Sequence, residues 1–257
     1  LLPAERAIAI VTDQPAADDE AWLTGLERAA AVVVPSAQMA RHPPANWRRI
    51  LATARQLVGI PHGGRGPPAP TDGGEVRSIL GLSQRGPLAV TRGPIDLGCT
   101  GSWERLPRTG VRLVAIADPE VARALAPVAE QMPRHLAIIG PDHRCAELAR
   151  RAADIHVFAA EYRPAPESVL ATAGGRLVVA HSSGEHVDRI VSWDPSSRTG
   201  NGLLFSPGEL MSALIVAGRE VDGPVLQAAA RRLDSSWGPA ARHYSRLANV
   251  VAKNWQR

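Results

Sequence analysis

Short apolar runs that alternate with amphipathic segments constrain the fold of this chain more than any other feature. From residue 88 onward, runs of four or five mostly apolar residues recur, and segments with helical spacing lie between most of them. This alternation is typical of βαβ units, which build a parallel sheet. The predicted strands are Leu88–Thr91, Arg112–Ile116, His135–Ile139, Ile155–Phe158 and Arg176–Ala180. The predicted helices are Pro119–Gln131 with Asp118 as its N-cap, Asp142–Ala152 and Glu167–Ala173.

A shorter α/β pattern precedes this region. Its predicted strands are Ala7–Val11, Ala31–Val34 and Leu57–Ile60, with helices at Asp18–Ala30 and Trp47–Gln56. The Pro- and Gly-rich run at 61–70 then marks a domain boundary. We predict a partial N-terminal segment at 1–64, a linker at 65–74 and a second domain at 75–257. The predicted fold class is α/β, a doubly wound parallel sheet with a partial second α/β segment and C-terminal helices. Those helices are Gly208–Ala217, Gly223–Leu233 and Pro239–Asn254, after a short extended piece at Asn201–Phe205.

Composition excludes several classes of protein. Apolar residues make up 45% of the chain and charged residues 21%, as in ordinary globular proteins. The net charge is only +4, and no basic stripe with interleaved aromatics is visible, so no nucleic-acid partner is expected. Cys99 and Cys145 form no CxxC pair, and no apolar run approaches the length of a membrane span. With no signal-peptide pattern either, a cytoplasmic location is expected. The first residue is not Met, so we expect the natural chain to start earlier.

Segments in the second half of the chain resemble one known family, in the same order and spacing. Ala153–Glu167 (ADIHVFAAEYRPAPE) parallels the pattern A-D-F-L-L-M-P-S-R-F-E-P-C-G-L, and Val178–Ile190 (VVAHSSGEHVDRI) parallels P-I-V-x-x-T-G-G-L-x-D-T-V. Gly200–Phe205, Pro207–Leu214 and Ser236–Tyr244 parallel the T-G-F-L-F, P-x-x-L-x-x-A-L and F-S-W-x-x-x-A-x-x-Y segments. The weaker upstream matches are Val32–Ala40 and Gly59–Gly64. These patterns are those of the glycogen and starch synthases, which are GT-B fold glycosyltransferases.

The resemblance implies an altered catalytic loop. In that family the Glu of E-P-C-G-L works close to the sugar, and the amides after it hold the nucleotide phosphates. Here Arg163 replaces that Glu and Ala165-Pro166 replaces Cys-Gly, so one phosphate-binding N–H is absent. The family's S-R-L-x-x-Q-K-G motif supplies an Arg and a Lys. Arg92 matches the Arg, but the Lys position falls near Leu97–Gly98, and no Lys precedes Lys253. No catalytic residue is therefore assigned.

Four residues are candidates for binding a nucleotide sugar. They lie in loops that follow predicted strands, where parallel sheets bind their ligands. The candidates are Arg92, Ser183, Gly184 and Glu185. Arg92 could instead be a surface residue at the end of a strand, and Arg163 could either bind an anion or pair with Glu167 one turn further on. His181 and His186 flank the same loop, but the set lacks a third ligand at metal spacing, so neither a metal nor a cofactor is expected.

Three functions fit these observations. The first is a glycogen-synthase-like protein that has lost catalysis and acts as a binding, scaffolding or regulatory subunit. The second is an active transferase that moves glucose from a nucleotide sugar to an α-glucan, with its missing half supplied in trans or trimmed away. The third is a purely structural subunit of a larger assembly. Because residues 1–64 match only part of an N-terminal domain, a protein partner or a second copy is expected to cover them.

Overall fold

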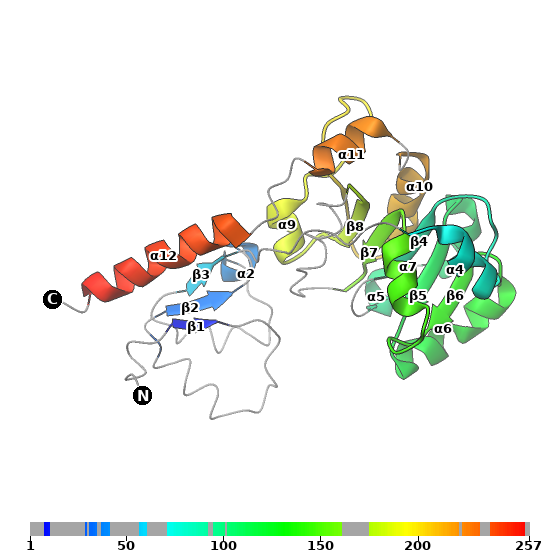
Figure 1. The fold of residues 1–257 in the computed structure, drawn as a ribbon, viewed down its shortest axis with the longest axis horizontal. Coiled ribbons are helices and arrows are strands. Elements are labelled where there is room, and N and C mark those ends of the chain that lie inside the picture. Colours follow the sequence, from blue (N-terminus) through cyan, green and yellow to red (C-terminus); the bar gives the residue numbers. More distant parts are fainter. Residues whose placement is uncertain are drawn as a thin grey trace.

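The computed structural model describes residues 8–10, 29, 31–34, 37–41, 57–60, 71–91, 95–100, 102–160, 175–220, 223–231 and 237–254. Within these ranges the chain forms two parallel sheets, one of six strands and one of three. Figure 1 shows the six-stranded sheet with its helices at one end of the molecule, and the three-stranded sheet with the C-terminal helix at the other. No helix in the described part of the chain is both long enough and apolar enough to span a bilayer.

The six-stranded sheet is parallel throughout, with the strand order β6-β5-β4-β7-β8-β9. Its strands are β4 (Leu88–Thr91), β5 (Arg112–Ile116), β6 (Leu136–Ile139), β7 (Ile155–Phe158), β8 (Leu177–His181) and β9 (Leu203–Phe205). The chain runs outward from β4 to β6, returns to the centre, and then runs outward again from β7 to β9. This order is that of the doubly wound dinucleotide-binding folds, in which the direction reverses between two central strands.

Helices cover both faces of this sheet. Side chains alternate along β4, so Leu88 and Val90 pack with α4 (Gly73–Ile79) and α7 (Ala146–Ala152), whereas Ala89 faces the opposite layer. That layer holds η3 (Trp103–Thr109), α6 (Pro119–Gln131), α10 (Leu210–Glu220) and α11 (Pro224–Arg231). Burial on both faces explains why the strands consist of continuous apolar runs instead of alternating polar and apolar residues.

The three-stranded sheet has the order β1-β2-β3 and is also parallel. Its strands are β1 (Ile8–Ile10), β2 (Ala31–Val34) and β3 (Leu57–Gly59). Helix α12 (Trp237–Asn254) packs on one face of it, where Leu247 and Val251 meet Ala31 and Val33. The end of the chain therefore leaves the six-stranded sheet and completes the core of the smaller one.

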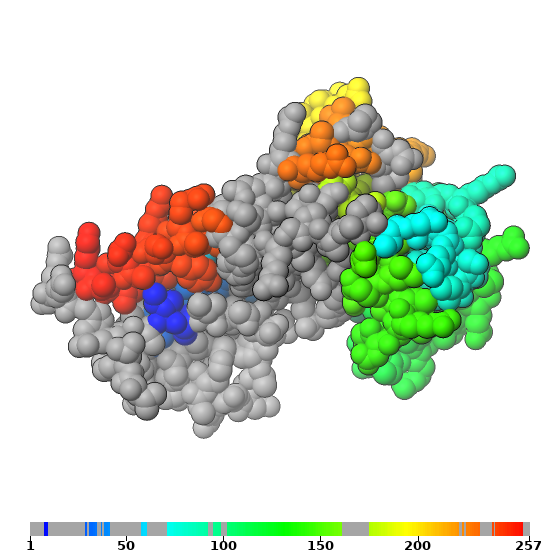
Figure 2. All heavy atoms as spheres, viewed as in Figure 1, coloured from blue at the N-terminus to red at the C-terminus, as the bar shows by residue number. Residues whose placement is uncertain are grey.

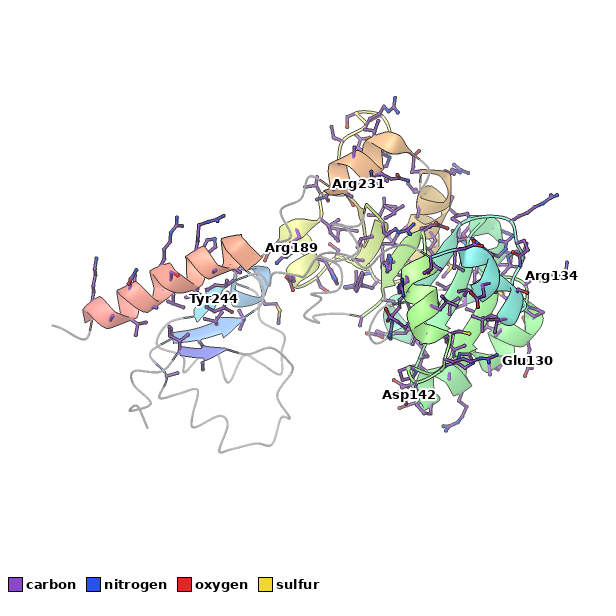
Figure 3. All side chains as sticks on the ribbon, viewed as in Figure 1. Glu130, Arg134, Asp142, Arg189, Arg231 and Tyr244 are labelled. Atoms are coloured by element: carbon purple, nitrogen blue, oxygen red, sulfur yellow. The ribbon has the colours of Figure 1, made fainter. Side chains whose placement is uncertain are left out.

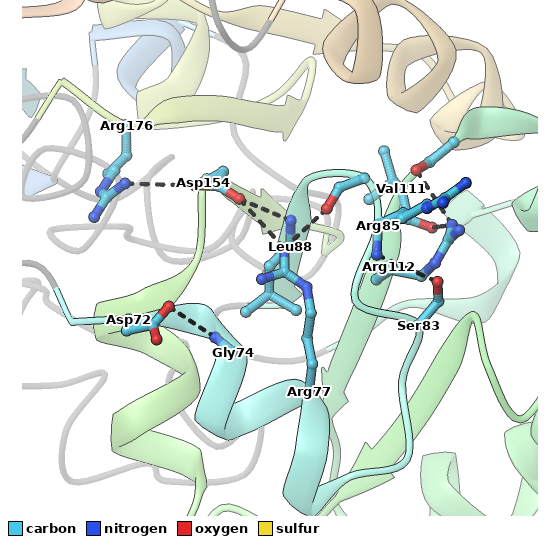
Figure 4. Close-up of polar contacts among 12 residues, drawn as sticks. Asp72, Gly74, Arg77, Ser83, Arg85, Leu88, Val111, Arg112, Asp154 and Arg176 are labelled. Atoms are coloured by element: carbon cyan, nitrogen blue, oxygen red, sulfur yellow. Dashed lines mark hydrogen bonds and ion pairs between the residues drawn. The ribbon is translucent and has the colours of Figure 1, made fainter.

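Arginine side chains tie the amino edge of the six-stranded sheet together (Figure 4). Asp154, just before β7, accepts a hydrogen bond from the backbone N–H of Leu88 at 2.9 Å and lies 3.8 Å from Arg77 and 3.7 Å from Arg176. Arg77 donates to the carbonyl of Gly86 at 2.9 Å, and Arg112 donates to the carbonyl of Gly110 at 3.2 Å. These contacts hold the turns that lead into β4 and β5.

Most predicted elements lie where the sequence indicated. The strands Leu88–Thr91, Arg112–Ile116 and Ile155–Phe158 are confirmed, as is helix Pro119–Gln131 with its cap, since Oδ1 of Asp118 accepts from the N–H groups of Glu120 and Val121 at 3.1 and 3.0 Å. The helix predicted at Asp142–Ala152 begins only at Ala146, because the preceding residues form turns. The short helices α2 (Ala37–Arg41), α5 (Leu97–Thr100) and α9 (Glu185–Arg189) and the 3-10 helix η3 were not predicted, because elements of four to seven residues show little periodicity.

Several predictions fall outside the described residues. The helices expected at Trp47–Gln56 and Glu167–Ala173 are among them, and so is Asp18–Ala30 apart from Ala29. The proposed linker lies outside them at 65–70, while Gly73 and Gly74 begin α4. The division of the chain into 1–64, 65–74 and 75–257 stays a prediction.

Candidate functional site

The carboxyl edge of the six-stranded sheet has its switch point between β4 and β7. The chain leaves these two adjacent strands toward opposite edges of the sheet, and doubly wound folds bind their ligands at this position. The backbone N–H of Asp96 donates to the carbonyl of Ala159 at 2.8 Å, which joins the segment after β4 to the segment after β7. The buried hydroxyl of Thr91 accepts from the N–H of Ile116 at 2.8 Å and closes the edge between β4 and β5.

The β8–α9 loop adds a set of buried polar groups beside the switch point. Nδ1 of His181 and Oγ of Ser183 lie 2.8 Å apart, and both side chains are buried. The N–H of Ser182 donates to the carbonyl of Phe205 at 2.8 Å, which fixes the start of the loop against β9. Gly184 follows with φ 57° and ψ −137°, a conformation that side-chain-bearing residues rarely adopt. Glycine has no Cβ atom and adopts this conformation without strain, so the turn of the loop depends on glycine at this position.

Glu185 is the fully buried carboxylate of this loop. Its exposed fraction is 0%, and Oε1 lies 2.8 Å from Nε of Arg189, one helical turn further along α9. The side-chain Nε–H of Arg189 does not make a hydrogen bond with this carboxylate, so the two side chains interact as an ion pair. Because a buried carboxylate without a countercharge is costly, this pairing holds Glu185 in the fold. The sequence could have indicated this ion pair, since oppositely charged residues four positions apart on a helix are neighbours.

His186 is a buried imidazole next to this ion pair. Only 2% of the residue is exposed, and its ring lies 5.2 Å from the ring of Phe158. Burial lowers the pKa of His186 to about 4, and the nearby Glu185 carboxylate opposes the shift only in part. No described residue hydrogen-bonds to Nε2 of His186. The imidazole is therefore neutral at pH 7 and packs beside Phe158 behind the loop.

Helix α9 also joins the two sheets. Oδ2 of Asp188 accepts a hydrogen bond from the backbone N–H of Ala37 at 2.6 Å, at the start of α2, and α2 packs against both β3 and α9. A carboxylate in this position satisfies a helix N–H that has no partner within its own helix. The sequence match to the family's Asp gave no sign of this role, because Ala37 and Asp188 are 151 positions apart.

Removing this contact is expected to loosen α2. Asp188→Ala deletes a helix-capping acceptor, which is worth about 1 kcal/mol, so amide exchange in residues 37–41 should accelerate about fivefold. The matched control is Asp72→Ala, which removes the carboxylate that accepts from the Gly74 N–H at 3.0 Å at the start of α4. Hydrogen exchange followed by mass spectrometry reads both helices in one experiment. Equal acceleration in α2 with the two variants would show that Asp188 does not hold α2.

Some of the predicted binding residues lie in the described part of the chain and others do not. Ser183, Gly184 and Glu185 lie together in the β8–α9 loop, but Ser183 and Glu185 already contact His181 and Arg189. Arg92 and Arg163 follow β4 and β7 in the sequence and lie outside the described residues. Within the described ranges, no group of three or more His, Cys, Asp and Glu side chains is arranged to hold a metal ion.

Similar folds occur among solved glycosyltransferases. The sequence matches no protein-family model and no curated protein at a significant level. The catalytic domain of starch synthase IV from Arabidopsis thaliana, solved with ADP and acarbose, superposes with a TM-score of 0.66 at 16% identity, over 90% of this chain and 58% of that one. Sucrose-phosphate synthase from Thermosynechococcus elongatus gives 0.60 at 20% identity, over 91% and 61%. Anabaena HepE, solved with UDP and glucose, gives 0.64 at 14% identity, over 96% and 71%.

These comparisons agree in architecture and differ in extent. The chain spans about three fifths of the length of the two synthases. This chain therefore has a GT-B glycosyltransferase-like fold.

Proposed function

We propose that this chain is a glycogen- and starch-synthase-like protein that binds a nucleotide or nucleotide sugar and has lost glucosyl transfer. It acts as a binding, scaffolding or regulatory subunit. The observation that carries the proposal is the carboxyl edge, which combines a doubly wound switch point with a β8–α9 loop that turns at Gly184 in a backbone conformation open to glycine.

Nucleotide binding is supported by this edge and by what similar proteins bind. The starch synthase IV structure holds ADP, and the HepE structure holds UDP and glucose. In this chain the segment after β4 begins with Arg92, whose guanidinium suits phosphate oxygens because it can donate two parallel hydrogen bonds. The backbone of Ser183 and Gly184 is the proposed contact on the β8 side. Their loop is held by the His181–Ser183 contact and by the bond from Ser182 to Phe205.

Loss of transfer is supported by the distribution of carboxylates. The resemblance puts Arg163 where the transferring enzymes have Glu, and a cation there would oppose the positive charge that develops on the sugar during transfer. Glu185 is the carboxylate of the neighbouring loop. It is buried and paired with Arg189, so it cannot take over that role without leaving an unpaired charge.

Calorimetry with ADP, UDP and their glucose conjugates tests the binding. We expect saturable heat with at least one of them, and an Arg92→Ala variant should weaken the binding at least tenfold, since a charge-assisted hydrogen bond contributes about 1.5–3 kcal/mol. The matched control is Arg123→Ala, an exposed arginine on α6, which should bind as the unaltered chain does. Absence of heat with all four nucleotides would remove the binding half of the proposal.

A separate assay tests the loss of transfer. With ADP-[14C]glucose or UDP-[14C]glucose and glycogen, no label is expected in the polymer. Incorporation above a boiled-protein control would contradict the loss of catalysis and favour the alternative, an active transferase. If neither binding nor transfer is found, the hypothesis of a purely structural subunit is favoured.

A further inference from the structure

The outer face of α12 carries a line of positive charge. Arg242, Arg246 and Lys253 are exposed, and with Asn249 they follow one another at spacings of four, three and four residues. These spacings bring side chains onto one face of a helix. The line from Arg242 to Lys253 covers about 16 Å, at 1.5 Å per residue. In Figure 2 this helix forms a ridge on the surface at the end of the molecule away from the six-stranded sheet.

This charge is segregated from the rest of the chain. Residues 223–257 contain six Lys and Arg and one Asp, a net charge of +5, whereas residues 1–222 contain 23 Lys and Arg against 24 Asp and Glu, a net charge of −1. The whole of the chain's positive excess therefore lies in its last 35 residues. A solvated helix ordinarily mixes both signs of charge along its surface, and α12 contains no acidic residue at all.

Neither intramolecular pairing nor the helix dipole accounts for the line. Among the residues that the structure describes, no carboxylate lies within ion-pair distance of Arg242, Arg246 or Lys253. Cations are favourable in the last turn of a helix, which explains Lys253. Arg242 and Arg246 lie in the first ten residues of α12, where the dipole does not favour positive charge, and the first turn has no acid to balance them.

Small exposed side chains lie beside the cations. The residues that contact the three-stranded sheet are Ala240, Tyr244, Leu247 and Val251. The residues that directly follow these four in the sequence form a second line along the helix, and all of them are small and exposed: Ala241, Ser245, Ala248 and Ala252. The residues that follow those in turn form the line with the positive charges. Figure 3 shows Tyr244 on the sheet side of α12 and long side chains projecting from the opposite side. Small residues of this kind allow another helix to approach closely.

The physical character of this face selects one kind of partner. The apolar face of α12 is already buried on the sheet, so the helix has no apolar side to insert into a membrane. A second copy of the chain would bring like charges together if the two α12 faces met. We propose that this face docks an acidic helix of a partner protein, whose carboxylates meet Arg242, Arg246 and Lys253 while its small residues pack on the Ala/Ser strip. The two arginines can each bind a carboxylate through two hydrogen bonds.

A helical peptide tests this docking on the full chain. The probe is a fluorescent, helix-stabilised peptide of about 20 residues with Glu at four-three-four spacing beside an Ala stripe. Its control is a scrambled peptide of the same composition. We expect salt-sensitive binding of the patterned peptide, and at least fivefold weaker binding of the scrambled one. The double variant Arg242→Glu/Arg246→Glu should reduce binding more than tenfold, because it replaces attraction by repulsion.

A matched variant separates position from net charge. Arg123→Glu/Arg134→Glu makes the same charge change on exposed residues near α6 and should alter binding less than twofold. Circular dichroism confirms that both double variants remain folded, and Ala248→Gln, which enlarges the strip without changing charge, should weaken binding about fivefold through loss of close packing. Equal weakening by the two charge reversals would overturn the proposal. So would binding to vesicles with 30% phosphatidylserine or to duplex DNA without binding to the patterned peptide. No nucleotide sugar is present, so failure here leaves the proposed function untouched.

Discussion

Gly86→Ala is expected to lower the free energy of unfolding by about 3 kcal/mol, a large effect for the addition of a single methyl group. Gly86 has φ +86°, and a Cβ atom built on it would lie 2.3 Å from the carbonyl oxygen of Gly110. The first feature imposes a backbone conformation that alanine rarely adopts, and the second forces the turn before β5 away from the turn before β4. Urea unfolding followed by circular dichroism measures the change.

The cost of Gly86→Ala also includes hydrogen bonds at the amino edge of the sheet. The carbonyl of Gly86 accepts from Arg77, and the carbonyl of Gly110 accepts from Arg112, so moving either turn disturbs both. Arg77 in turn lies 3.8 Å from Asp154, whose carboxylate bonds to the first residue of β4. A shift at Gly86 should therefore spread along the start of the central strands.

Gly81→Ala is the matched control for this prediction. Gly81 also has a positive φ, +69°, but a Cβ atom there would meet nothing within 4 Å. It follows α4, and the N–H of Leu82 bonds to the carbonyl of Arg77, as at helix ends closed by a left-handed residue. We expect only the conformational cost of about 1 kcal/mol. If the two variants lose the same stability, the close approach to Gly110 is not what requires glycine at position 86.

The second large effect is a loss of stability in acid that depends on His186. Its pKa is lowered from 6.5 to about 4 by burial, so between these pH values the unfolded chain binds a proton that the folded chain does not. The stability that the neutral, buried ring retains above pH 6.5 is therefore lost as the pH falls. By linkage this loss amounts to roughly 3 kcal/mol at pH 4.

His186→Phe isolates this contribution, because it removes the titrating group and keeps an aromatic ring beside Phe158. Urea unfolding at pH 7 and pH 4.5 should show that the variant loses about 2–3 kcal/mol less than the unaltered chain over this interval. The same substitution at His243, which is exposed on α12, should leave the acid loss unchanged. An equal acid loss in the His186 variant would mean that other groups cause it.

The sequence predicts where the candidate site lies, but it does not predict the side-chain contacts within it. The loop after β8 was predicted from the family resemblance and from the rule that ligands bind at the carboxyl ends of parallel strands. The sequence did not predict the contact between Ser183 and His181, because side chains two residues apart meet only where the backbone turns. Glu185 was predicted to bind a ligand, and this stays a prediction; the sequence analysis did not foresee its buried ion pair with Arg189.

The sequence by itself determined the parallel α/β class, the positions of the central strands and the capped helix α6. Each of these depends on short-range patterns of apolar burial and on local hydrogen bonds, so neighbouring residues suffice to specify them. Only the tertiary structure shows that α12 completes the core of the three-stranded sheet and that Asp188 caps α2 from 151 positions away. It also shows that position 86 has no room for a Cβ atom. These features depend on which distant surfaces meet, and that choice is set by packing across the whole chain.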